Sequence, residues 1–224
     1  MYIKNSYITY GYRLTFLILC GGNLLLHFSF DDMEANSRMF AYFTVESQIL
    51  SFVAFLFSAK SAHDEIRYHS VPYFRYSHSS LRGIAVLAML ITFISYQYML
   101  KSTGFTMYSY GNTLSFVKDL ISHFILPLMV VGDWLLFQPK GLYRWFDTLL
   151  WLLFPFCYLI LILLRGFFTQ KYPYFFLNVE EIGFLKVCIF VCIYLTCILI
   201  IGFVFFLIDK ALSWIAARLE MHRQ

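Results

Sequence analysis

Charged side chains are scarce in this sequence: Asp, Glu, Lys and Arg together make up 13% of the 224 residues, whereas hydrophobic residues make up 60%. A water-soluble single domain does not need so much apolar surface, and the mean hydropathy of +0.69 agrees with this. The scarcity of charge therefore excludes a soluble globular protein. The formal net charge of +4 is spread over short connections without a basic stripe, so no nucleic-acid partner is expected. The expected partner is a membrane lipid.

A metal-binding pattern is also missing. The five cysteines lie inside apolar runs, and Cys188 and Cys192 share a helix face without a second Cys or His pair at zinc spacing. No metal and no cofactor are therefore expected, and the favoured interpretation of the cysteines is buried small side chains. No small-x-small cleavage site follows the first apolar run, so we expect this run to be kept as a membrane span.

In place of charge, the sequence has apolar runs of about twenty residues, the length that crosses a hydrocarbon core of about 30 Å. Backbone groups in lipid must be bonded within their own segment, so each run is expected to be helical. Pro127 and Pro155 fall inside two of the runs, where a membrane span tolerates a kink. The sequence predicts an all-α, polytopic membrane protein in which residues 1–224 form a single six-span domain, with spans at about 9–29, 40–59, 82–100, 114–137, 147–168 and 184–208.

Most Lys and Arg residues of the connections fall on one side of these spans, and the positive-inside rule then places both termini in the cytoplasm. The longest cytoplasmic connection, from Lys60 to Arg82, also carries His63, His69 and His78, for which a solvated loop is favoured over a metal site. The residues counted on the cytoplasmic side are Lys4, Lys60, Arg67, Arg75, Arg82, Lys140, Arg144, Lys210, Arg218 and Arg223, against Arg38, Lys101, Arg165 and Lys171 on the other side.

Hydrogen-bonding side chains of three spans are expected to lie in one layer, in the outer-leaflet half of the membrane. Residues three or four apart share a helix face, as Asp119 and His123 do. Polar groups at such depth are costly unless they face the bundle interior or water, so a cluster of them indicates a functional site. The side chains of this layer are Asn23 and His27 in the first span, Thr44, Ser47, Gln48 and Ser51 in the second, and Asp119, Ser122 and His123 in the fourth.

Each of these residues also has a structural interpretation. A Thr in a span most often bonds the carbonyl one turn back, and a lone His such as His27 is more often a packed side chain than a catalyst. His123 is harder to explain in this way, because Asp119 lies one turn before it and Pro127 one turn after. A non-catalytic lipid-binding scaffold therefore stays open as an alternative.

Two further alternatives use the same layer. A small transporter or proton-coupled channel would titrate His27, Asp119 and His123 in turn. The inner halves of the spans are nearly all apolar in sequence, so no continuous polar path to the cytoplasm is expected. A metal or haem held by His27 and His123 is a weaker variant of the enzyme interpretation, which the metal content of the purified protein would decide.

Several short motifs follow one another in the order of a known family: residues 42–50 (YFTVESQIL), 123–127 (HFILP) leading to 133–137 (DWLLF), and 172–174 (YPY). With these motifs, nearly the whole chain resembles the bacterial branch of the androgen-induced and androgen-dependent transmembrane hydrolases. The resemblance implies six spans, a place in the bacterial cell membrane, and an intramembrane Thr and His pair that hydrolyses fatty-acid esters of hydroxy fatty acids. The matching positions are Thr44 and His123.

On these residues, the implied chemistry is ester hydrolysis within the bilayer. Thr44 Oγ attacks the ester carbonyl after His123 removes its proton, and water then cleaves the acyl-enzyme. Asp119 is expected to orient His123, and the acyl chains of the ester reach the site laterally from lipid. The expected hydrogen-bond donors to the oxyanion are Ser47, Gln48 and Asn23.

Overall fold

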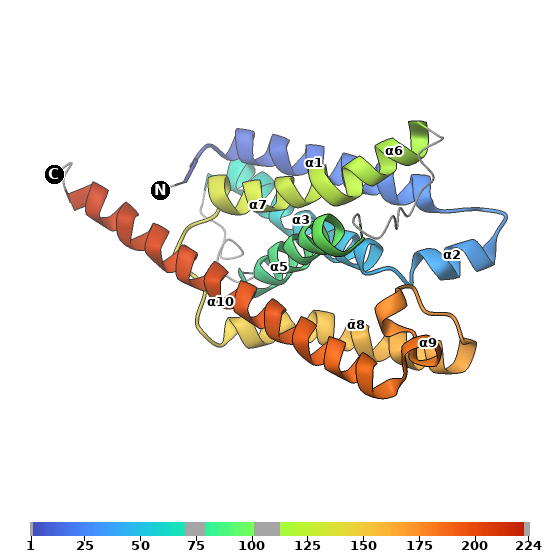
Figure 1. The fold of residues 1–224 in the computed structure, drawn as a ribbon. Helices are drawn as coiled ribbons and strands as arrows, with labels where there is room; N and C mark the ends of the chain where they lie inside the picture. The colour runs from blue at the N-terminus through green and yellow to red at the C-terminus, as the bar shows by residue number, and fades with distance from the viewer. Residues whose placement is uncertain (1, 70–78, 101–112, 222–224) are drawn as a thin grey trace.

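The structure, a computed structural model, describes residues 2–69, 79–100 and 113–221, and every regular element among them is a helix (Figure 1). This confirms the predicted all-α class. In chain order the elements are α1 (Ser6–His27), α2 (Met33–Met39), α3 (Phe43–Tyr68), α5 (Ser79–Ser95), the π-helical turn η1 (Tyr96–Leu100), α6 (Thr113–Leu120), the π-helical turn η2 (Ile121–Ile125), α7 (Leu126–Phe137), α8 (Asp147–Thr169), the 3-10 turn η3 (Phe175–Leu177), α9 (Val179–Ile182) and α10 (Phe184–Met221).

Four helical segments of the described residues are long and apolar enough to cross a membrane: Ser79–Tyr98, Thr113–Phe137, Asp147–Thr169 and Phe184–Leu219. The pair of α2 and α3, bent by 78°, passes the same test when taken together, which gives up to five spans. Helix α1 is not among them, since Arg13 and Asn23 lower the mean hydropathy of an otherwise apolar helix. Several apolar helices of this length indicate a multi-pass membrane protein.

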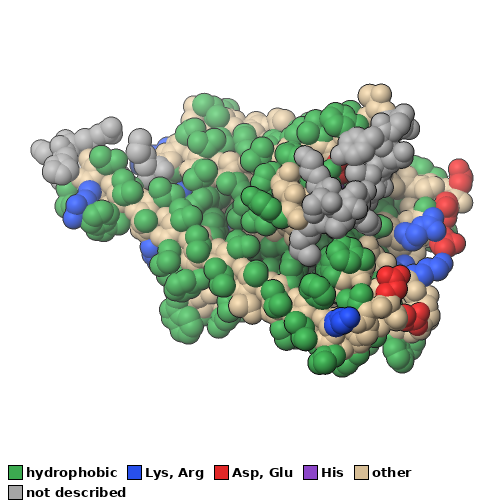
Figure 2. All heavy atoms as spheres, in the orientation of Figure 1, with side chains coloured by type: hydrophobic (Ala, Val, Ile, Leu, Met, Phe, Trp, Pro, Cys, Tyr) green, Lys and Arg blue, Asp and Glu red, His purple; other side chains and the backbone are tan. Residues whose placement is uncertain are grey.

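The distribution of side chains on the surface fits this class. In Figure 2, hydrophobic side chains cover the middle of the molecule, whereas Lys, Arg, Asp and Glu gather toward its ends. Large apolar side chains of α10 such as Ile193, Ile200 and Leu207 are about half exposed. Apolar side chains exposed in a continuous belt are stable against hydrocarbon rather than water.

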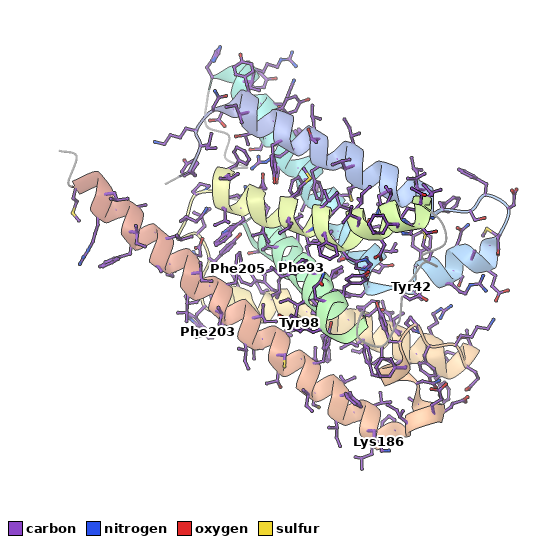
Figure 3. The ribbon with its side chains drawn as sticks, turned by 45° about the horizontal axis from the view of Figure 1, so that its top comes forward. Tyr42, Phe93, Tyr98, Lys186, Phe203 and Phe205 are labelled. Atoms are coloured by element: carbon purple, nitrogen blue, oxygen red, sulfur yellow. The ribbon has the colours of Figure 1, made fainter. Side chains whose placement is uncertain are left out.

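The helices pack around α5. Helix α3 lies between α1 and α5, α5 also packs against α7 and α8, and α10 packs on α8. The anchor of α10 is Phe205, which is buried among the rings of Trp134, Tyr143 and Trp151, with centroids 4.5 to 5.6 Å away. Figure 3 shows the contrast with Phe203, which lies on the outer side of the same helix. Helices α8 and α10 therefore cover one side of the bundle that α1, α3, α5 and α7 form.

Two helices extend beyond the predicted spans. Helix α3 continues to Tyr68 instead of ending at residue 59, so His63 is part of a helix rather than of a loop, while His78 lies outside the described residues. Helix α10 continues from the predicted end at residue 208 to Met221. Hydropathy marks only the part of a helix that suits lipid, and Ala, Lys, Glu and Arg continue a helix beyond it. The short helix α2, capped by Asp32 Oδ1 at 2.8 Å from Ala35 N, was not predicted.

The halves of α1 and α7 that lie away from Asn23 and His123 are less apolar than predicted, because they contain a buried ion pair. Arg13 Nε lies 2.7 Å from Asp133 Oδ1, and the two residues are 4% and 1% exposed. Arg13 Nη1 also donates to the carbonyl of Ser58 at 2.7 Å, and Gln138 Nε2 donates to Asp133 Oδ2 at 2.7 Å. The pair joins α1, α3 and α7 about 15 Å along α1 from Asn23. Hydropathy misses it because the two charges lie on different helices and each is surrounded by apolar neighbours in sequence.

This ion pair gives a prediction about stability. Asp133→Ala leaves the guanidinium of Arg13 buried without its carboxylate, which costs about 3–5 kcal/mol. We expect a clearly lower Tm for this variant in detergent, measured by loss of the monodisperse peak after heating. The double variant Arg13→Met/Asp133→Leu removes both charges and should lie closer to the wild type. A single variant as stable as the wild type would contradict this role of the pair.

Candidate active site

Thr44 and His123 meet in the interior, although they are 79 residues apart in the sequence. Thr44 is the second residue of α3 and His123 is the middle residue of η2. The distance from Thr44 Oγ1 to His123 Nε2 is 3.2 Å, which is within the reach of a nucleophile and its base. The residues are 5% and 2% exposed. The imidazole is therefore placed to accept the proton of the Thr44 hydroxyl.

The other nitrogen of His123 faces Asp119. His123 Nδ1 lies 2.9 Å from Asp119 Oδ1, one helical turn earlier. Tyr96 holds both groups, because its hydroxyl donates to Asp119 Oδ2 and its ring stacks on the imidazole with centroids 4.0 Å apart. Nδ1 also bonds the backbone carbonyl of Asp119 at 3.2 Å, and because a carbonyl can only accept, Nδ1 carries the proton and Nε2 is free to accept, as a general base requires. Thr44, His123 and the Asp119 carboxylate thus lie next to one another in the order of a catalytic triad, with the carboxylate at ion-pair distance from the imidazole.

The π-helical turn η2 explains how His123 comes to face the interior. Leu126 N–H bonds the carbonyl of Ile121, five residues back. Pro127 has no N–H to offer the carbonyl of His123, so the regular bonding pattern fails at this turn and the helix widens. Such π turns inside α-helices are frequent at functional sites, because they shift side chains by one position around the helix axis.

The remaining polar side chains of the layer form a second group beside His123. Asn23 Nδ2 donates to Gln48 Oε1 at 3.0 Å and to Ser122 Oγ at 2.9 Å, which links α1, α3 and η2. His27 Nδ1 lies 2.7 Å from the carbonyl of Asn23, one turn back on its own helix. Ser51 is fully buried one turn further along α3. The structure thus brings together the polar residues of three helices.

Ser47 holds the backbone of Thr44 in place. Its Oγ donates to the carbonyl of Thr44 at 2.9 Å and bonds Thr92 Oγ1 at 2.9 Å. The hydrogen bonds of Ser47 and Asn23 therefore run to other protein groups, and neither residue lines the cavity in front of Thr44. These two side chains fix the position of α3 relative to α1 and α5.

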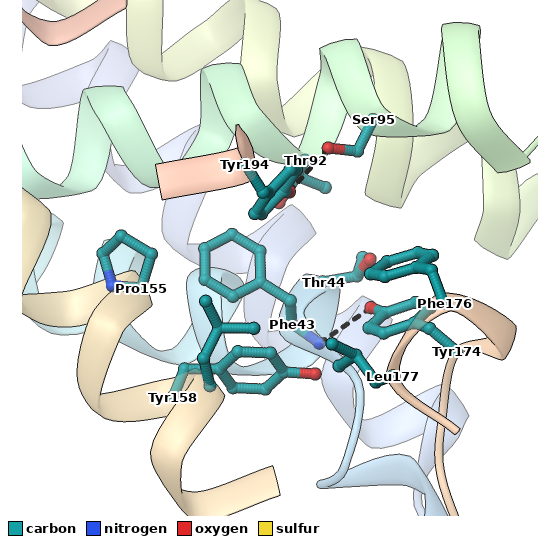
Figure 4. A pocket seen from close by; sticks show the side chains of 11 residues that line it. Phe43, Thr44, Thr92, Ser95, Pro155, Tyr158, Tyr174, Phe176, Leu177 and Tyr194 are labelled. Carbon is teal, nitrogen blue, oxygen red and sulfur yellow. Dashed lines mark hydrogen bonds between the residues drawn. The ribbon is translucent and has the colours of Figure 1, made fainter. Parts of the chain in front are cut away.

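A small cavity lies in front of Thr44 (Figure 4). Its volume of about 30 Å³ has room for one or two water molecules. Tyr174 at its edge accepts the N–H of Phe43 at 3.1 Å, and the Tyr158 hydroxyl donates to the carbonyl of Ala41 at 2.7 Å. The cavity therefore meets Thr44 where a reacting group needs space. Its walls are formed by Phe43, Thr44, Thr92, Ser95, Pro155, Tyr158, Leu159, Tyr174, Phe176, Leu177 and Tyr194.

The backbone at Thr44 favours negative charge. Thr44 belongs to the first turn of α3, at the positive end of the helix dipole. Val45 and Glu46 N–H bond the carbonyl of Tyr42, and Phe43 N–H bonds the Tyr174 hydroxyl. These N–H groups are already bonded, so an oxyanion that forms next to Thr44 would be favoured by the helix dipole rather than by these donors.

Sequence reasoning did not single out Tyr96, Thr92 or Tyr194. A signal for the first two was present, because Thr92 and Tyr96 are four residues apart with Ser95 between them in an otherwise apolar span. For Tyr194 the sequence offers no signal, since it is one of many aromatic residues in an apolar helix. Its place at the site depends on the packing of α10 across the bundle.

Among the described residues, no group of three or more His, Cys, Asp or Glu side chains is placed to hold a metal ion. Of the five cysteines, Cys20 is buried, whereas Cys157, Cys192 and Cys197 are exposed on the helix surfaces. The fold and the site thus define an all-α, multi-pass membrane protein with a buried Thr, His and Asp cluster. Comparison with protein families, with curated proteins and with solved structures found no match.

Proposed function

We propose that this protein is an intramembrane ester hydrolase in which Thr44 is the nucleophile and His123 is the general base. The observation that carries the proposal is the contact of 3.2 Å between Thr44 Oγ1 and His123 Nε2, with Asp119 2.9 Å from the opposite ring nitrogen. A nucleophile, its base and an orienting carboxylate in this order are the requirements of acyl transfer through a covalent intermediate.

Other threonines of the membrane helices show what a structural role looks like. Thr15 Oγ1 donates to the carbonyl of Gly11 at 3.0 Å, and Thr196 Oγ1 donates to the carbonyl of Cys192 at 2.8 Å. Thr44 stands at the start of its helix and its hydroxyl contacts an imidazole. The contact with His123 therefore favours a chemical role for Thr44 over back-bonding.

The reaction proceeds in two half-reactions. His123 Nε2 takes the proton of the Thr44 hydroxyl as Oγ bonds the ester carbonyl carbon, and the carbonyl electrons move to its oxygen at the N-terminal end of α3. When the tetrahedral centre collapses, the C–O bond of the ester breaks and His123 gives the proton to the leaving alcohol. Water, deprotonated by His123, then attacks the acyl-threonine and releases the fatty acid. Asp119 stabilises the imidazolium in both halves.

The proposed substrate is a lipid ester of a fatty acid, taken up from the bilayer. We propose that the chain is a member of the transmembrane hydrolase family that it resembles, in a bacterial cell membrane. In the topology we propose, α1 is a sixth span and both termini are cytoplasmic. Thr44 and His123 then lie in the outer-leaflet half of the bundle, level with Asn23.

A permeation path through the bundle is disfavoured by an apolar layer. This layer separates the buried ion pair of Arg13 from the polar cluster around Asn23. Between Arg13 and Asn23 on α1, the ring of Phe16 stacks on Phe55 of α3 with centroids 3.7 Å apart, and both residues are buried. Two stacked rings offer no hydrogen-bonding site for a proton or ion. Esters that reach Thr44 from lipid do not have to pass this layer.

Labelling with a lipid-like fluorophosphonate tests the proposal. The probe phosphonylates a hydroxyl that a neighbouring base activates, so the detergent-purified wild type should be labelled and Thr44→Ala and His123→Ala should not. A long-chain ester should compete with the probe. Folded wild-type protein that stays unlabelled, or labelling that persists in both variants, would overturn the assignment.

A further inference from the structure

An apolar groove opens on the membrane-facing side of the protein, between α5 and α10. Its volume is about 310 Å³, which is within the usual range of binding sites for small ligands. Ile94 and Tyr98 line it from α5 and η1, and Phe190 and Ile193 line it from α10. Figure 3 shows Tyr98 beside α10. Ile193 is 57% exposed and Phe190 is 45% exposed, so the groove is open along the outer surface of α10.

The inner end of the groove meets the cavity in front of Thr44. Ser95, Phe176 and Tyr194 line both spaces, so these three side chains form a common boundary between the groove and the cavity. Ser95 Oγ and the Tyr194 hydroxyl are 2.8 Å apart and hydrogen-bonded, which joins α5 to α10 at this point. Two of the hydroxyls of the groove, those of Ser95 and Tyr194, thus lie at its inner end, and apart from the hydroxyl of Tyr98 the rest of its lining is hydrocarbon and sulfur.

We infer that this groove is the binding site for the acyl chain of the ester that Thr44 cleaves. The inference rests on the proposed function, and it assigns the occupant as a linear hydrocarbon chain. The cavity of about 30 Å³ in front of Thr44 accommodates the ester group alone, so a long chain attached to it must continue elsewhere. The groove is the adjoining apolar space, and it is open to the lipid from which the substrate comes.

Binding of the chain requires the side chain of Tyr194 to move away from Ser95. Its hydroxyl bonds Ser95 across the boundary of the two spaces, and this single hydrogen bond is the polar link that a passing chain separates. The largely hydrocarbon lining of the groove suits methylene groups, since burying them next to isoleucine and phenylalanine needs no polar partner. The groove therefore selects for chain length and not for the alcohol part of the ester.

Photo-crosslinking tests this site without requiring turnover. The probe is a hexadecanoyl ester with a diazirine near its methyl end, added to the full-length Thr44→Ala variant in detergent. We expect adducts on the groove segments 91–98 and 190–201, and competition by an unlabelled hexadecanoyl ester but not by a butyryl ester. Ile193 lines the groove and is exposed to lipid, so the larger side chain of Ile193→Trp should fill part of the groove. We expect this variant to lower the yield of the adducts about tenfold, because the bound chain loses contact for roughly two methylene groups.

Leu207→Trp is the matched control, because Leu207 is 49% exposed on the same helix and does not line the groove. It should leave the adducts unchanged. Adducts spread evenly over the lipid-facing helices, or a yield that Ile193→Trp does not lower, would overturn the groove as the acyl site. Hydrolysis of the butyryl ester by the otherwise wild-type Ile193→Trp protein reports separately on Thr44. If the wild type crosslinks specifically in the groove but does not hydrolyse the butyryl ester, the proposed reaction is rejected while the groove as acyl site stands. The chain would then bind next to a residue that is not an active nucleophile.

Discussion

Thr44→Ala should abolish hydrolysis of a long-chain fatty-acid ester by the purified protein, and Thr44→Ser should keep part of it. Alanine removes the attacking oxygen, whereas serine keeps a hydroxyl within reach of His123 Nε2, which lies 3.2 Å from Thr44 Oγ1. Loss of a base-activated nucleophile lowers kcat by about 10⁴-fold or more. The measurement is the rate of fatty-acid release at saturating ester in detergent.

Two controls accompany this prediction. Thr196→Ala removes a threonine that bonds a carbonyl one turn back in α10, and it should leave the rate unchanged. The double variant Thr44→Ala/His123→Ala should be no slower than either single variant, because the two residues act in one step. A folded Thr44→Ala protein with the wild-type rate would contradict the assignment of the nucleophile.

Asp119→Asn should lower kcat by about 10²–10⁴-fold with little change in KM. Asparagine has nearly the same size as Asp119, but it removes the negative charge that lies 2.9 Å from His123 Nδ1. The imidazolium that forms when His123 takes the proton of Thr44 then lacks this stabilising charge, so the barrier to proton transfer rises. Rates measured over a range of ester concentrations separate the two constants.

Tyr96→Phe tests the same positioning of Asp119 and should have a smaller effect. It keeps the ring that stacks on His123 and removes only the hydroxyl that donates to Asp119. We expect about a tenfold loss in kcat, as for one charge-assisted hydrogen bond of 1.5 kcal/mol or somewhat more. Asp119 is a positioning residue in this account, so an effect of Asp119→Asn on KM alone would mean that its role is structural.

The helical class follows from hydropathy because the energy of apolar side chains in lipid dominates the choice of structure. The ends of the helices are predicted less well from hydropathy. Helix α3 continues through a polar stretch to Tyr68, since nothing in that stretch breaks a helix even though it no longer suits hydrocarbon. The buried Arg13 and Asp133 pair was missed for a related reason, because hydropathy averages over one helix and the two charges compensate each other between helices.

At the site, spacing along single helices indicated part of the arrangement. Asp119 and His123 are four residues apart, and this predicted their shared face. Spacing does not give the contact between Thr44 and His123, which depends on how α3 packs against η2 and on the π turn at Pro127. The tyrosines around the cavity come from α8, α10 and the segment before η3, so only the packed bundle brings them together.

The position of the covalent adduct tests the central claim most directly. Wild-type protein would be phosphonylated with the lipid-like probe, cleaved, and examined by tandem mass spectrometry of the peptide that spans residues 43–51. The account predicts the added mass on Thr44, the hydroxyl 3.2 Å from His123 Nε2. An adduct on Ser47 or Ser51 of the same peptide, or on a residue outside it, would contradict the assignment of Thr44 as the nucleophile.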